Sequence, residues 1–179
     1  METSVNRKLA YIAGGLVVAG VVMRLLPHLP NLAPVGAIAI FGGALLPRRV
    51  AWWLPLAIMV ASDALIGFYD GIWFTWIAFL LVGLFGMALR RTTNPRRVVY
   101  GALGSSAIFF IVSNFGVWAS GDMYAHTWSG LMQCYAMGLP FLRNTLAGDL
   151  LYSSILFGTY ALAAHAVQRN SVRSLDNIA

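Results

Sequence analysis

The segment PFLRNTLAGDLLY, residues 140–152, places Arg143, Asn144 and Asp149 within an otherwise apolar stretch. A charged side chain at membrane depth costs at least ~2.5–3.5 kcal/mol, so it persists where it faces water, the interior of a helix bundle or an opposite charge. Two kinds of chemistry fit these residues. They can line a polar binding chamber, or they can form ion pairs that lock helices together.

Three further polar side chains, Arg24, Asp63 and Asn114, lie near the ends of other apolar runs, at the same expected membrane depth as Asp149. Random scatter would not select one depth, which favours a shared chamber. Nearby aromatic side chains can stack on a planar ligand or form an interfacial belt. The sequence predicts a ligand-binding set of Arg24, Asp63, Asn114, Trp118, Tyr124, Trp128, Tyr135, Arg143, Asn144 and Asp149. The alternative is an ion pair of Arg24 or Arg143 with Asp63 or Asp149.

The sequence contains no recognisable metal, nucleotide or hydrolase motif. His126 and Cys134 are weak candidates for ligating a metal carried inside a bound cofactor, since their spacing matches no metal motif. A single cysteine excludes an internal disulfide. Without a Walker A sequence, a GxSxG or an HExxH, ATP-driven work requires a partner, and no intrinsic cofactor or catalytic residue is predicted.

The composition indicates the elements that must position these residues. Of 179 residues, 59% are hydrophobic and 10% are charged, and the mean hydropathy is +0.74. These values indicate an integral membrane protein, and we expect a single all-α domain over residues 1–179. Hydrophobic runs predict a bundle of six transmembrane helices, at residues 9–26, 32–46, 51–68, 72–89, 98–119 and 144–167.

The distribution of the twelve lysines and arginines predicts the orientation. All but Arg24 and Arg143 fall on one side of the six-span arrangement, which the positive-inside rule assigns to the cytoplasm. Both termini are therefore expected in the cytoplasm. The net charge of +6 is explained by topology, so no nucleic-acid partner is predicted. The cytoplasmic set is Arg7, Lys8, Arg48, Arg49, Arg90, Arg91, Arg96, Arg97, Arg169 and Arg173.

Two other segments have an expected role. The fifth loop, residues 120–143, contains an apolar segment that is too short to cross the membrane by itself. This segment is predicted to be a re-entrant or interfacial helix, or a lid. Small residues four apart in the first span allow close helix approach, either within the bundle or to a partner subunit. These candidate docking residues are Ala10, Gly14, Gly15 and Ala19.

The segments RLLPHLPNLAPVGAIAIFGGALLP, LAIMVASDALIGFYD and SNFGVWASGDMYAHTWSGLMQCYAMGLPFLRNTLAGDLLY resemble a family of small bacterial six-span membrane proteins without an assigned activity. As a class, these are similar to the substrate-binding S components of energy-coupling-factor (ECF) vitamin transporters. The similarity implies an outward-facing pocket formed by helix ends and loops one, three and five. It also implies docking of the first helix onto a transmembrane coupling subunit driven by cytoplasmic ATPases.

We therefore expect a transport protein of the bacterial cytoplasmic membrane. It would bind a vitamin or related micronutrient from outside and move it inward, alone or with an ECF-type module. A membrane enzyme or cofactor-processing protein acting at the outer face is one alternative. A non-catalytic assembly subunit is another.

Overall fold

A computed structural model describes the backbone of residues 2–90, 92 and 94–176, and the side chains of residues 11–90, 92 and 94–165. Several predicted residues therefore lie, with their side chains, outside the described part. These are the docking candidate Ala10 and the basic residues Arg7, Lys8, Arg91, Arg169 and Arg173.

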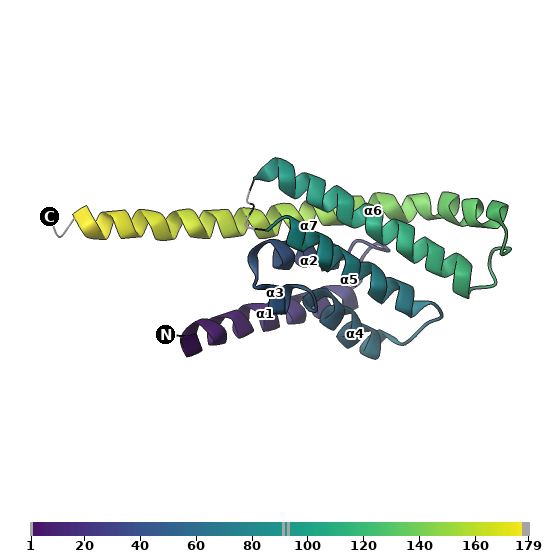
Figure 1. Cartoon of the computed structure of the whole chain (residues 1–179), viewed down its shortest axis with the longest axis horizontal. Helices are drawn as coiled ribbons and strands as arrows, with labels where there is room; N and C mark the ends of the chain where they lie inside the picture. The colour runs from purple at the N-terminus through teal and green to yellow at the C-terminus, as the bar shows by residue number, and fades with distance from the viewer. Residues whose placement is uncertain (1, 91, 93, 177–179) are drawn as a thin grey trace.

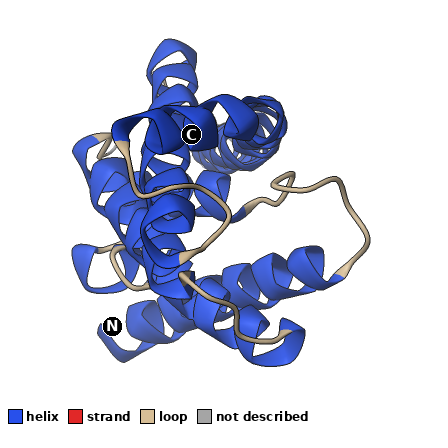
Figure 2. Ribbon diagram, turned by 90° about the vertical axis from the view of Figure 1, so that its right-hand side faces the viewer, coloured by secondary structure: helices blue, strands red, loops and turns tan. Residues whose placement is uncertain are grey.

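The described residues form helices, turns and connections, with no strand among them (Figure 2). This confirms the all-α prediction. The elements are α1 (Glu2–Leu25), α2 (Val35–Leu45), α3 (Arg48–Ala51), α4 (Leu54–Ile66), α5 (Ile72–Ala88), α6 (Pro95–Ser120) and α7 (Trp128–Asp176).

The helices run along one long axis and alternate in direction, with α3 and α4 running as one unit (Figure 1). Helix α1 begins and α7 finishes at the same end of this axis. The ends of α1, α4 and α6 and the beginnings of α2, α5 and α7 consequently lie toward the opposite end. That arrangement gathers the 26–34, 67–71 and 121–127 connections there.

Three apolar segments are long enough to cross a membrane by length and composition: Arg48–Ile66, Pro95–Ser120 and Trp128–His165. Tyr11–Leu25, Val35–Leu45 and Ile72–Ala88 are shorter. With 11 residues, α2 is only about 16 Å long, against a hydrocarbon core of ~30 Å. Each predicted span therefore corresponds to a helical element, but the structure supports three full-length spans rather than six.

The prediction for the fifth loop was wrong in its structure. Residues 128–143 form neither a re-entrant segment nor a helix separate from the last span. They are the first turns of α7, a helix of 49 residues in total that contains Pro140 in its interior. Proline lacks only one helical donor, and a neighbouring helix can support the interrupted turn. The connection is reduced to residues 121–127.

Helix α2 forms the centre of the bundle. Val35 and Ile38 pack with Ile58 of α4 in one hydrophobic cluster, and Ile40 packs with Val82 of α5 in a second. Gly43 allows this position, because a Cβ there would lie 2.7 Å from the Gly86 Cα. The α2 and α5 backbones therefore meet where neither helix carries a side chain, as in other close helix contacts in membranes.

We expect Gly43→Ala to destabilise the protein by roughly 1–3 kcal/mol, since the added methyl must displace the backbone of α5. Thermal unfolding of the purified protein measures the effect. Gly14→Ala is the matched control, because a Cβ at Gly14 meets nothing within 4 Å and alanine is the better helix former. Equal melting temperatures for the two variants would contradict this contact.

Candidate functional site

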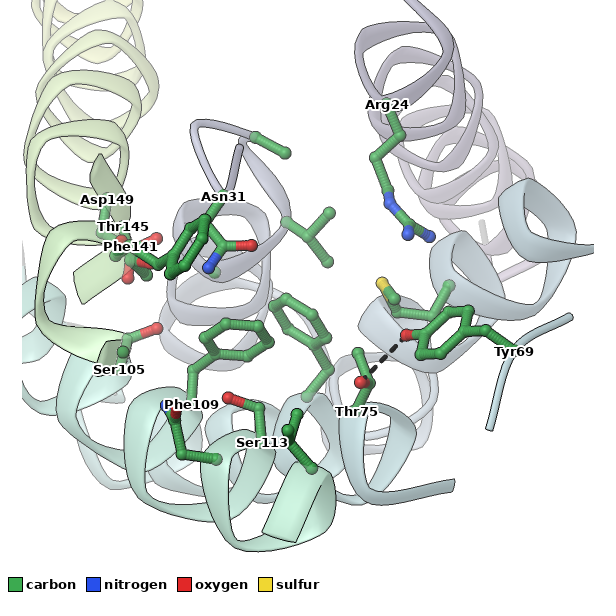
Figure 3. Close-up of a pocket in the computed structure, with 18 of the residues that line it drawn as sticks. Arg24, Asn31, Tyr69, Thr75, Ser105, Phe109, Ser113, Phe141, Thr145 and Asp149 are labelled. Carbon is green, nitrogen blue, oxygen red and sulfur yellow. Dashed lines mark hydrogen bonds between the residues drawn. The ribbon is translucent and has the colours of Figure 1, made fainter. Parts of the chain in front are cut away.

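A cavity of about 490 Å³ lies between the helix ends. Six of the seven helices and all three connections at this end contribute residues to it. Figure 3 shows part of this lining, with Arg24 on one side and Asp149 on the other. The connections contribute the exposed residues His28, Asn31, Tyr69 and Met123, whereas Gly36, Ser105 and Asp149 form a buried floor. Of the predicted ligand-binding residues, four line it: Arg24, Asn114, Tyr124 and Asp149.

Asp149 joins three helices at the floor of the cavity. It extends from α7, is 2% exposed, and accepts a hydrogen bond from Ser106 Oγ of α6 at 2.8 Å. It also accepts from the backbone amide of Ala37, in the first turn of α2. Pro34 provides no side-chain cap for that helix, so Asp149 satisfies one of its free amides and interacts favourably with its dipole.

Ser105 is the second polar group of the floor. Its side chain is 1% exposed, and its Oγ lies beside the Asp149 carboxylate, because both approach the position that a Gly36 Cβ would occupy. Within the described residues, Oγ has no hydrogen-bond partner of normal geometry. Leaving a buried hydroxyl unpaired costs about 1–3 kcal/mol. The floor therefore places a weakly bonded hydroxyl next to a carboxylate.

Arg24 and Asp63 form an ion pair, at 2.8 Å between Nη1 and Oδ1. The same Nη1 also donates to Ser62 Oγ, and Trp76 Nε1 donates to Asp63 Oδ2 at 2.7 Å. Arg24 lines the cavity, but Asp63 lies behind it, fully buried. The structure thus forms one of the ion pairs that the sequence left as an alternative, between α1 and α4.

Tyr69 borders the mouth from the α4–α5 connection. Its hydroxyl donates to Thr75 Oγ1 at 3.0 Å (Figure 3). Partial burial of the ring raises the pKa of the Tyr69 phenol above its usual value. The phenol therefore stays protonated at neutral pH, and because its O–H is donated to Thr75, its oxygen remains as an acceptor at the rim.

Three of the four predicted stacking aromatics do not line the cavity. Trp118 Nε1 donates to the Ala125 carbonyl at 3.0 Å and so holds the α6–α7 connection. Tyr135 OH donates to the Ile111 carbonyl at 2.8 Å and links α7 to α6. Trp128 is 75% exposed at the start of α7, as an interfacial belt residue would be. Only Tyr124 faces the cavity.

The remaining candidates divide between structural positions and the cavity wall. Asn144 Nδ2 donates to the Pro30 carbonyl at 3.0 Å, which ties α7 to the first connection, whereas Arg143 is exposed outside the cavity. Cys134 lines the cavity, and its thiol donates to the Asn114 carbonyl at 3.3 Å. His126 packs on Trp118 outside it. No cluster of three metal-ligating side chains occurs among the described residues.

Sequence reasoning missed most of the cavity wall. Ser105, Phe109, Ser113 and Val117 line it from α6 and recur every four residues, which places them on one helix face. The α7 wall follows the same rule backward from Asp149. Its members are Thr145, Phe141, Gly138, Met137 and Cys134. Helical spacing from the polar residues is the signal that identifies these positions.

The docking candidates Gly14, Gly15 and Ala19 lie on an exposed face of α1. A Cβ on either glycine would meet nothing within 4 Å. No described element packs against this face.

Residues 3–172 match the model of a protein family described as a Family of unknown function (DUF6580). The chain belongs to this family. No curated protein and no solved structure matched it in the same comparisons. Membership in the DUF6580 family assigns no activity, and the cavity is the feature that bears on function.

We expect Arg24→Gln to destabilise the protein by roughly 3–5 kcal/mol, since it leaves the buried Asp63 without its opposite charge. Asp63→Asn should cost less, because the Arg24 that it leaves is only partly buried. The double variant should be less destabilised than the sum of the two, because neither charge remains. Thermal or denaturant unfolding of the wild type, the two single variants and the double variant gives the free energies of unfolding for this double-mutant cycle. Strictly additive losses would show that the two side chains are not coupled.

Proposed function

We propose that this protein is a membrane transport protein that binds a small nutrient in the cavity and moves it inward across the bacterial cytoplasmic membrane. The main support for this proposal is the cavity. Its volume of about 490 Å³ falls within the ~300–1,000 Å³ usual for small-molecule sites. Apolar and aromatic walls with a few convergent polar groups are also typical of such sites. A vitamin or related micronutrient has this size.

The proposed topology has six helical passes with both termini in the cytoplasm. Helix α3 and the α5–α6 connection lie at the end where α1 begins and α7 finishes (Figure 1). Helix α3 carries Arg48 and Arg49, the connection carries Arg90, and the first turn of α6 carries Arg96 and Arg97. The positive-inside rule assigns such an end to the cytoplasm. The cavity mouth is at the other end, and therefore faces outward. The short α2 is supported as a pass by burial within protein rather than by length.

Energy for uptake is proposed to come from outside this chain or from the nutrient gradient. The exposed small-residue face of α1 is the place where an ECF-type coupling subunit, with its cytoplasmic ATPases, would dock. Close backbone approach is the property that such a face offers. The same protein acting alone is the simpler form of this proposal.

Native mass spectrometry of the protein, purified gently from its own membranes, tests binding. We expect a co-purifying small molecule with the wild type and its loss with Ser113→Phe, which projects a ring into the cavity from α6. Ile111→Phe is the matched control, because Ile111 is 55% exposed on the same helix. The spectrum also reveals any partner subunit.

Retention of the molecule by Ser113→Phe would contradict a cavity site. Uptake of the identified molecule into proteoliposomes then separates transport from other roles. Chemical conversion that requires Cys134 would favour the membrane enzyme, and a stable partner complex without any ligand would favour the assembly subunit.

Cysteine labelling tests the orientation. In a Cys134→Ser background, we expect a membrane-impermeant thiol reagent to label Asp122→Cys in intact cells, and to label Asn94→Cys only after permeabilisation. Both positions are exposed, in the α6–α7 and α5–α6 connections respectively. The reverse labelling pattern would place the cavity mouth on the cytoplasmic side.

A further inference from the structure

The two polar clusters of the cavity differ in charge balance. At one side, the Arg24 guanidinium is neutralised by Asp63 at 2.8 Å. At the floor, no basic side chain of the described residues pairs with Asp149, whose neighbours are the Ser106 hydroxyl, the Ser105 hydroxyl and the Ala37 backbone amide. The other basic residue of the cavity, His28, is exposed at the mouth. The cavity therefore carries an excess negative charge at its deepest point.

The α2 dipole compensates only part of this charge. A helix N-terminus is equivalent to about half of an elementary positive charge, which leaves about half of the carboxylate charge unbalanced. The buried Ser105 Oγ lies beside the same carboxylate and interacts with it, but not through a hydrogen bond of normal geometry. A positively charged N–H group placed at the floor would bond to Asp149 and Ser105 together.

The wall next to the floor suits the rest of such a ligand. Phe79 of α5 and Phe109 of α6 line the cavity with ring centroids 4.9 Å apart, and Phe141 lines it from α7 (Figure 3). Aromatic faces attract cations as well as apolar groups, by about 0.5–2 kcal/mol for each cation. These rings give a flat or apolar body an aromatic surface to pack on.

We propose that the ligand is an organic cation, with its protonated nitrogen bound by Asp149 and Ser105 and its aromatic or apolar body packed against the phenylalanine rings. The inference rests on the proposed function, since it names the chemical class of nutrient that the same cavity accepts. The alternative ligands are neutral or anionic molecules of the same shape, for which the floor offers a weaker fit.

Three probes with one indole body test the charge preference: tryptamine, which is cationic, indole-3-ethanol, which is neutral, and indole-3-acetate, which is anionic. Calorimetric titration of the full-length protein in nanodiscs gives each dissociation constant. We expect tryptamine to bind at least about tenfold more tightly than either of the others, as a charge-assisted hydrogen bond predicts.

Asp149→Asn should reduce the tryptamine preference to within about twofold, while Asp122→Asn, which removes an exposed carboxylate outside the cavity, should leave it unchanged. Since Asp149 also supports α2, Asp149→Asn is first compared with the wild type by thermal unfolding. If it folds poorly, Ser105→Ala carries the test. It should weaken tryptamine binding more than indole-3-ethanol binding.

Equal or tighter binding of the neutral or anionic probe would overturn the inference, as would the absence of binding by all three. A tryptamine preference that survives both Asp149→Asn and Ser105→Ala would also overturn it. The proposed function would stand in each case if the wild type still co-purifies with a molecule that Ser113→Phe excludes. The proposed function itself would be contradicted if the wild type co-purifies with no molecule that Ser113→Phe excludes.

Discussion

The bundle depends on one carboxylate, that of Asp149, placed where three helices meet. It supplies the cap that the α2 sequence lacks, it accepts from Ser106 of α6, and it extends from α7. A buried charge is tolerated only with such partners. The same group forms the cavity floor, so packing and recognition depend on the same atoms. Arg24 and Asp63 perform a different task, since they neutralise each other and link α1 to α4.

The helical elements could be predicted from hydrophobic runs, because Pro34, Pro47 and Pro95 mark their beginnings and the intervening residues are almost entirely apolar. The fifth loop could not. Pro140 and Gly138 read as helix breakers, yet both lie inside α7. The α6 surface explains this, because Gly138 provides the space that the Asn114 side chain occupies, with a Cβ there only 2.9 Å from Asn114 Cγ. Contact with a neighbouring helix overrode the local signal.

Some cavity residues could be predicted because they are polar residues in apolar runs. Others could not, because the rotation of a helix about its axis decides which side chains face the cavity. Asp149 and Asn114 stand out in apolar runs and do line the cavity. Trp118 and Tyr135 have the same chemistry as Tyr124, but their polar atoms bond to backbone carbonyls elsewhere. Ser105 attracts no notice in a sequence, because small hydroxyl residues are common in helix contacts. Its importance arises only from its position beside Gly36 and Asp149.

The central position of α2 has a mechanical consequence. This helix is a short rod, with the cavity floor at its first turn and the Pro47–Arg48 bend just beyond its last. Over residues 39–43 its backbone contacts α5 at Gly86, where no flexible side chain can absorb a shift. At this contact α2 and α5 can therefore move only together. A rearrangement of the bonds that Asp149 makes at the first turn of α2 is accordingly either accommodated at the floor or shared by both helices.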